Sequence, residues 1–122
     1  MADNYEQFSE MLVVPEEKRA EVIAFLTRKE EDDGEYYPAD WAMETEGLWL
    51  HSDYGFDEES LIEQVQGVLN IIDSDEPFII SVAYTCSKPR LEEFGGFAYK
   101  IWRDTYDAVN ARSAAEKLEK PK

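Results

Sequence analysis

The stretch from Asp57 to Cys86 constrains the fold most, because it places a helix pattern directly before a strand pattern. Asp57 is a good helix N-cap, and the acidic residues that follow it suit the positive end of a helix dipole. Apolar side chains then recur on one helical face, at Leu61, Val65, Val68, Leu69 and Ile72. We therefore predict a helix over Glu58 to Ile72. The alternation within Phe78 to Cys86 predicts a mostly buried strand.

The remaining segments place strands and helices around this unit. Further strands are predicted at Gln7 to Val14, Trp41 to Glu46, Leu48 to Ser52 and Gly96 to Arg103, and further helices at Pro15 to Lys29 and Asp104 to about Leu118. The run from Glu30 to Glu35 repels itself and lacks apolar residues, so we expect a loop there. The order predicts an α+β fold in a single domain over residues 1 to 122. Its class is a ferredoxin-like βαββαβ sandwich with an extra C-terminal strand and helix.

The chain length and the rare residues bound the class of protein. At 122 residues the chain is long enough for one core and short for two domains. Its one cysteine, Cys86, cannot form an internal disulfide, which fits a reducing compartment, and its one histidine, His51, leaves no Cys/His zinc set. The N-terminus has no signal-like pattern, and no segment approaches 18 consecutive apolar residues. We expect a cytoplasmic protein, in the host cytoplasm if a phage encodes it.

Negative charge dominates the composition and is concentrated in the centre of the chain. The formal net charge is −16. From Glu30 to Ser87 there are sixteen Asp and Glu and no Lys or Arg, whereas the two flanking segments sum to zero. Such a field repels nucleic acid and anionic membranes and speeds encounter with basic protein surfaces. We therefore predict a basic protein as the partner, with no direct binding of nucleic acid or membrane.

The predicted contact residues are the acids and loop tyrosines of this central stretch. They are Glu30, Glu31, Asp32, Asp33, Glu35, Tyr36, Tyr37, Asp40, Glu44, Glu46, Asp53, Tyr54, Asp57, Glu58 and Glu59. Since duplex DNA carries one charge per ~1.7 Å of axis, sixteen carboxylates match about 27 Å, or roughly eight base pairs. Mimicry of DNA is therefore one hypothesis, and acidity that only keeps the chain soluble is the alternative. Trp49, in the middle of a predicted strand, is expected to be buried.

Three weaker sites have plainer explanations. Cys86 lies beside Lys88 and Arg90, but a catalytic thiol would need His51 as its base, so we expect a small buried residue at a strand end. The loop site of Lys88, Arg90, Gly95 and Gly96 can hold an anion, or it can be a strand connection. Neither the acids at Asp73, Asp75 and Glu76 nor those at Asp53 and Asp57 to Glu59 have the pattern of a calcium loop. We predict no catalytic residues, no metal and no cofactor.

Several short motifs carry a resemblance to a known family. They are Asn4-Tyr5-Glu6-Gln7-Phe8-Ser9-Glu10, Gly47-Leu48-Trp49-Leu50-His51-Ser52, and Thr85-Cys86-Ser87-Lys88-Pro89-Arg90 followed by Glu93-Phe94-Gly95-Gly96. Together they resemble a family of small, acidic, uncharacterised proteins carried by bacteria, plasmids and phages, over roughly residues 4 to 102. The family pattern continues with a third small residue where this chain has Phe97, which argues against a site that needs a bare backbone there. The resemblance implies a bacterial or mobile-element setting and no particular activity.

These observations favour a non-catalytic inhibitor, DNA-mimic-like and directed against host defence, that occupies a basic surface of a nucleic-acid-binding host protein. The alternative is a bacterial immunity-type or housekeeping interaction domain, in which the acidity serves solubility and one particular partner. A small hydrolase or thiol enzyme is the third class, and it lacks an evident set of catalytic residues.

Overall fold

The computed structural model describes residues 4–33, 38–88 and 94–121, without the side chain of Asp33. Its strands are β1 (Asn4–Leu12), β2 (Asp40–Glu44), β3 (Gly47–Ser52), β4 (Phe78–Cys86), β5 (Gly95–Ile101) and β6 (Tyr106–Asn110). Its helices are the 3₁₀ turn η1 (Glu16–Lys18), α1 (Arg19–Asp33), α2 (Glu58–Ile71) and α3 (Ala111–Glu116). The fold is α+β, as the sequence predicted.

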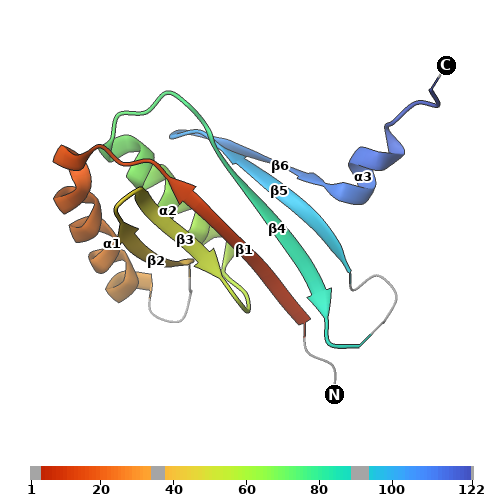
Figure 1. Ribbon diagram of the computed structural model, residues 1–122, viewed down its shortest axis with the longest axis horizontal. Coiled ribbons are helices and arrows are strands. Elements are labelled where there is room, and N and C mark those ends of the chain that lie inside the picture. The colour runs from red at the N-terminus through yellow and green to blue at the C-terminus, as the bar shows by residue number, and fades with distance from the viewer. Residues whose placement is uncertain (1–3, 34–37, 89–93, 122) are drawn as a thin grey trace.

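The six strands form one antiparallel sheet in the order β2-β3-β1-β4-β5-β6. Helices α1 and α2 lie against one face of it, and α3 follows β6 at the C-terminal end (Figure 1). The core lies between these helices and the inner side chains of the sheet, and it includes Val22 and Leu26 from α1, Leu61 and Val65 from α2, and Leu50 and Ile80 from the strands. Neither α1 nor α2 covers the opposite face.

Strand β1 changes its closely paired neighbour along its length. Its first half, Asn4 to Gln7, pairs with β4, and its second half, Phe8 to Leu12, pairs with β3. Beyond Gln7 the ladder with β4 stops, and the Glu10 carboxylate accepts a hydrogen bond of 2.8 Å from the backbone N–H of Ser81. A side chain thus takes the place of a backbone acceptor where the two halves of the sheet separate.

The turn between β2 and β3 is held from both sides. Gly47 has φ of +149°, and a Cβ there would stand 2.5 Å from the carbonyl oxygen of Leu12, so glycine is required. Arg19, at the start of α1, donates hydrogen bonds to the carbonyl oxygens of Glu44 and Thr45 at 3.1 and 2.9 Å. These contacts fix the acidic turn against the start of α1.

The structure corrects the prediction of a loop that begins at Glu30. The acidic run does not begin a loop at Glu30, because α1 continues to Asp33. Glutamate is a good helix former, and buried Lys29 pairs with Glu63 of α2 at 3.2 Å, which holds this last part of α1 in place. Residues 34–37, also predicted as loop, lie outside the described residues.

The C-terminal segment is not the single helix that was predicted from Asp104 to Leu118. The N–H of Trp102 donates to the carbonyl oxygen of Thr105 at 2.8 Å, and this turn returns the chain along β5 as β6. The side chain of Asn110 then caps α3, by accepting from the N–H groups of Arg112 and Ser113. Pairing with β5 therefore overrides the helical pattern of this polar segment.

Candidate functional site

The described carboxylates among the predicted contact residues face solvent. Exposed acids are found at Glu30, Glu31, Asp32, Asp40, Glu44, Glu46, Asp53, Glu58 and Glu59. Asp57 is half-buried because its carboxylate accepts a hydrogen bond of 2.9 Å from the N–H of Ser60 and so caps α2. The predicted contacts Glu35, Tyr36, Tyr37 and the side chain of Asp33 lie outside the described residues.

These acids come from three segments of the described chain. One group lies at the end of α1, a second on the edge strand β2 and its turn, and a third on the connection from β3 into α2. The third group continues into a groove of about 560 Å³ between α2 and the β5–β6 connection. Its carboxylates, from Glu58, Glu59, Glu63 and Asp104, define what we call the acidic groove.

In the acidic groove, the Glu58 carboxylate is held by two tyrosine hydroxyls. Glu58 accepts hydrogen bonds from the hydroxyls of Tyr99 and Tyr106, at 2.7 and 3.2 Å. Burial and the hydrogen bond to Glu58 raise the pKa of Tyr99, and the negative charge of Glu58 raises the pKa of Tyr106. Both hydroxyls therefore stay protonated at neutral pH, and they hold the Glu58 carboxyl group in place as a hydrogen-bond acceptor.

The negative charge of Glu58 also affects the pKa of Glu6 in β1. Burial first, and the Glu58 carboxylate second, raise the pKa of Glu6 above its ordinary value of 4.5. The predicted contacts did not include Glu6, Glu63 or Asp104. Glu59 and Glu63 are four residues apart on one helix face, a spacing visible in the sequence, whereas Asp104 reaches the groove only through the β5–β6 turn.

Part of the central acidity is neutralised by cations from the flanking segments. In the described part of the chain, ion pairs join Arg103 to Asp73 and Asp75, at 2.5 and 2.8 Å, and Lys29 to Glu63. The predicted contact carboxylates with described side chains lie outside these pairs. The predicted contact carboxylates are therefore not neutralised by these pairs, whereas Glu63 of the acidic groove is paired with Lys29.

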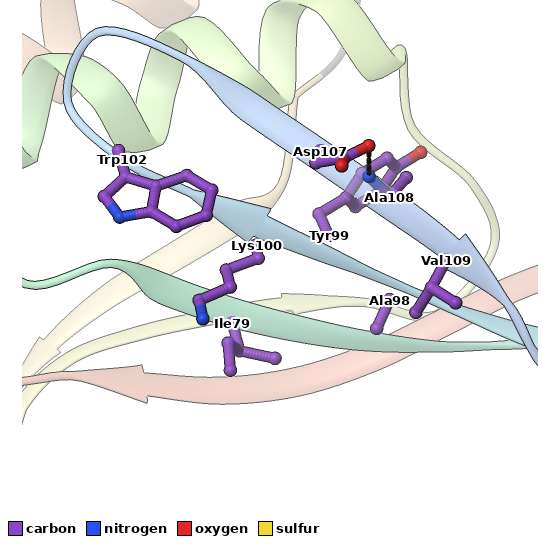
Figure 2. A pocket seen from close by; sticks show the side chains of 8 residues that line it. All are labelled: Ile79, Ala98, Tyr99, Lys100, Trp102, Asp107, Ala108 and Val109. Carbon is purple, nitrogen blue, oxygen red and sulfur yellow. Dashed lines mark hydrogen bonds between the residues drawn. The ribbon is translucent and has the colours of Figure 1, made fainter. Parts of the chain in front are cut away.

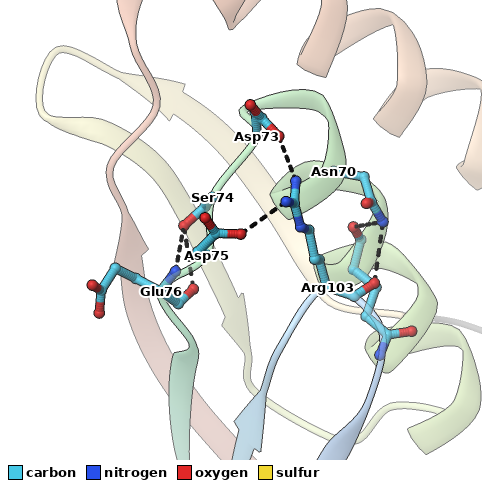
Figure 3. A network of polar contacts seen from close by, with 7 residues as sticks. Asn70, Asp73, Ser74, Asp75, Glu76 and Arg103 are labelled. Atoms are coloured by element: carbon cyan, nitrogen blue, oxygen red, sulfur yellow. Dashed lines mark hydrogen bonds and ion pairs between the residues drawn. The ribbon is translucent and has the colours of Figure 1, made fainter.

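Arg103 pairs with two of the three acids after α2, Asp73 and Asp75 (Figure 3). Asp73 has φ of 54°, and the hydrogen bonds Asp73 N–H to Asn70 and Ser74 N–H to Leu69 close the helix as a Schellman motif. Arg103 lowers the pKa of Asp73 through a hydrogen bond and its positive charge. Among the residues that the structure describes, no three of His, Cys, Asp and Glu gather as metal ligands do.

The aromatic candidates lie differently from what was expected. Tyr54 is 66% exposed and packs edge-on against Tyr5, with ring centroids 5.2 Å apart. Trp49 was expected in the core, but it is half-buried on the face of the sheet that α1 and α2 leave open. Its ring stacks on His51 with centroids 3.9 Å apart, and its Nε1–H donates to the Ser9 hydroxyl.

The structure separates Cys86 from His51, and it describes the predicted loop site only in part. Cys86 is 8% exposed at the inner side of the end of β4, as expected for a small buried residue. His51 points from β3 to the opposite face of the sheet, so the two side chains do not form a catalytic pair. Gly95 and Gly96 pair with Tyr84 and Ala83 of β4, Lys88 is exposed, and Arg90 lies outside the described residues.

No helix within the described ranges is long and apolar enough to cross a membrane. Comparison of the chain with family models, with curated proteins and with solved structures finds no match.

Proposed function

We propose that this chain is a non-catalytic acidic binding protein that occupies a basic surface of another protein. The partner class that we favour is a nucleic-acid-binding host protein, which makes the chain a DNA-mimic-like inhibitor carried by a phage or other mobile element and directed against host defence. The observation that carries the proposal is the set of exposed carboxylates outside any ion pair among the described residues, with those at Glu58 and Glu59 lining the acidic groove.

The arrangement of charge supports binding of basic side chains. Glu58 is held in place by two tyrosine hydroxyls, so less side-chain entropy is lost when a lysine or arginine pairs with it. The groove also carries Glu59 and Asp104, and Glu63, which is already paired with Lys29. A long cationic side chain entering the groove would meet several carboxylates at once, which favours proteins over neutral ligands.

The test is competition on a DNA-binding protein captured from bacterial lysate. Its affinity for the acidic chain should fall steeply from 0.1 to 1 M salt, a range over which the Debye length falls from about 10 to about 3 Å. Its DNA should displace the acidic chain. Affinity that is constant across this range of salt, or simultaneous binding of DNA and the acidic chain, would contradict DNA mimicry.

A charge-matched pair of variants locates the contact. Glu59→Gln with Asp104→Asn removes two carboxylates from the acidic groove, and each loss should weaken binding by up to about fivefold, because an exposed ion pair is worth about 0.2–1 kcal/mol. Glu16→Gln with Glu17→Gln removes the same charge from the exposed turn η1. Equal losses in both variants would mean that net charge, and not the groove, determines affinity.

The second candidate is an immunity-type or housekeeping interaction domain with one dedicated protein partner. The half-exposed Trp49–His51 stack on the open face of the sheet favours it, since aromatic side chains at a surface are typical of specific protein interfaces. This candidate predicts capture of a single toxin or subunit whose binding nucleic acid does not affect.

We also propose that β1 to β4 with α1 and α2 form a ferredoxin-like unit, extended at the β4 edge by β5 and β6. The element order β1-α1-β2-β3-α2-β4 and the neighbours β2-β3-β1-β4 support this. Backbone contacts in solution between β1 and both β3 and β4 should be observed by NMR, and contacts between β1 and β2 would contradict the unit.

A further inference from the structure

We propose that the outward face of the sheet is a docking surface for the basic protein partner. An apolar side chain of the partner fills a groove beside Trp102 on this face. This rests on the proposed function and adds to the acidic groove, which is lined by α2, a second surface that the same partner contacts. We call this surface the open face. It consists of the side chains of β3, β1, β4 and β5 that point away from α1 and α2, together with Trp102 and the outward residues of the edge strands.

None of the described residues that point outward at the centre of the open face is an acid. Register and alternation place its outward residues at Trp49, His51, Tyr5, Gln7, Ser9, Met11, Ile79, Ser81, Ala83, Thr85, Gly96, Ala98 and Lys100. No Asp or Glu occurs among these described positions, although 28 of the 122 residues of the chain are acidic. An acid-free centre in so acidic a chain argues that this face is reserved for contact and not for solubility.

Apolar side chains are exposed at this centre. Met11 is 41% exposed and Ile79 is 51% exposed, and Val109 of the neighbouring edge strand is 49% exposed. A shallow groove of about 300 Å³ runs over β4, β5 and β6, lined by Ile79, Ala98, Lys100, Trp102, Asp107 and Val109 (Figure 2). An apolar side chain of a partner fits such a groove, and Trp and Tyr at a surface are typical anchors of protein interfaces.

Lys100, at the centre of the open face, already contacts the ring of Trp102. The Lys100 ammonium lies 5.2 Å from the centre of the Trp102 ring, as in a cation–π contact. Figure 2 shows both side chains beside the groove. Lys100 therefore contributes its aliphatic stem to the groove, and it does not make the open face an anion site.

Carboxylates at the two edges of the open face favour a basic partner. Asp40 and Glu44 lie on the outward side of β2, opposite His51 and Gly47 in the register, and Asp107 lies on the outward side of β6, opposite Lys100. A partner seated on the apolar centre would thus bring its own rim against carboxylates at both edges, where lysine and arginine are favoured. A second copy of this chain would bring acids against acids, which its net charge of −16 further opposes.

Two charge-matched peptides test the proposal. One is a ten-residue peptide that alternates Lys with Leu, and the other alternates Lys with Gly. Titrated into isotope-labelled protein, the Lys-Leu peptide should shift the amide signals of Ile79, Ala98 and Val109 and change the fluorescence of the tryptophans. The Lys-Gly peptide should perturb only acid-bearing segments and bind at least fivefold more weakly.

A variant pair ties the preference to the groove. Ile79→Gln with Val109→Thr removes exposed apolar groups from the open face, and Leu118→Gln removes one from the C-terminal segment, where Leu118 is 79% exposed. Both positions of the first variant are half-exposed, so we expect the melting curve to be preserved. The first variant should bind the two peptides equally well, and the control should keep the preference for Lys-Leu.

The results of the peptide experiment distinguish a failure of the open face as docking surface from a failure of the proposed function. Equal, salt-dependent binding of both peptides to the unaltered chain would overturn the open face as docking surface and leave the basic partner standing. If neither peptide binds at 0.1 M salt, the proposed function itself fails. A concentration-dependent dimer that Ile79→Gln with Val109→Thr dissociates would also overturn the proposal, because the occupant would then be a second copy of the chain.

Discussion

The side-chain amide of Gln64 makes two hydrogen bonds with the backbone of Ala39. Its Oε1 accepts from the Ala39 N–H at 3.1 Å, and its Nε2 donates to the Ala39 carbonyl oxygen at 3.2 Å. Gln64 is 1% exposed, in the middle of α2, and Ala39 immediately precedes the edge strand β2. One buried side chain thus satisfies both polar groups of a backbone unit that has no place in the sheet, and it anchors β2 to α2.

Gln64→Leu should therefore destabilise the chain strongly. Two buried backbone groups lose their partners, and we expect the free energy of unfolding to fall by about 2–4 kcal/mol. Urea unfolding at neutral pH measures this. Gln66→Leu is the control, because Gln66 donates only one hydrogen bond, to the Trp102 carbonyl oxygen at a part-buried position. Equal losses in the two variants would show that the double bond to Ala39 has no special weight.

Gly67→Ala should destabilise the chain although alanine is the better helix former. A Cβ at Gly67 would overlap the ring of Phe25 from α1. The gain of about 1 kcal/mol in helix propensity is then outweighed by an overpacking cost of about 1–3 kcal/mol. Thermal unfolding checks the sign. The double variant Phe25→Leu, Gly67→Ala should recover part of the loss, and strict additivity of the two changes would contradict the overlap.

Glu6→Gln should stabilise the chain at neutral pH. Because the pKa of Glu6 is raised in the folded state, the folded chain holds the proton more tightly than the unfolded chain, and stability falls as pH rises from 4.5 through the raised pKa. Replacing the carboxyl with an amide removes this loss. Melting temperatures should therefore exceed those of the unaltered chain at pH 7 and converge with them near pH 4. Glu16→Gln controls for the loss of a charge in general.

Glu10→Ala should open the sheet locally where β1 and β4 separate. The Ser81 N–H loses its acceptor, and its amide hydrogen should exchange faster with solvent by about two- to tenfold, as expected for loss of roughly 0.5–1.5 kcal/mol. Glu10→Gln keeps an acceptor oxygen and should leave the exchange of Ser81 close to that of the unaltered chain. Unchanged exchange in Glu10→Ala would mean that water or backbone satisfies this amide.

The parts of the fold with strict hydrophobic periodicity were predictable from the sequence. Helix α2 and strand β4 lie within one residue of their predicted bounds, because each buries a regular series of side chains. The end of α1 was missed because its contact, the pair of Lys29 with Glu63, lies 34 residues away in the sequence. The C-terminal segment was missed because β6 is exposed on every residue, so no alternation marks it as a strand.

The types of residue at the candidate site were predictable from the sequence, but their arrangement in space was not. Exposed acids follow from charge density, as at Glu30 and Glu59. The open face depends on the order of the strands, which brings Met11 of β1 beside Trp49 of β3. Nothing local in the sequence reveals that neighbourhood. Asp104 reaches the acidic groove for the same reason, through a turn that the sequence did not predict.

Strand β1 also has a consequence for how the chain folds. Its partners are about 40 and 80 residues away, as in Phe8 with Ser52 and Asn4 with Cys86, whereas β2 with β3 and β4 with β5 and β6 are joined by direct connections. The local hairpins can therefore form early, and β1 must close two long loops before either ladder is gained. We expect the first dozen residues to join the sheet last, between two halves that have already formed. Their removal would leave the two halves without the strand that pairs with both of them.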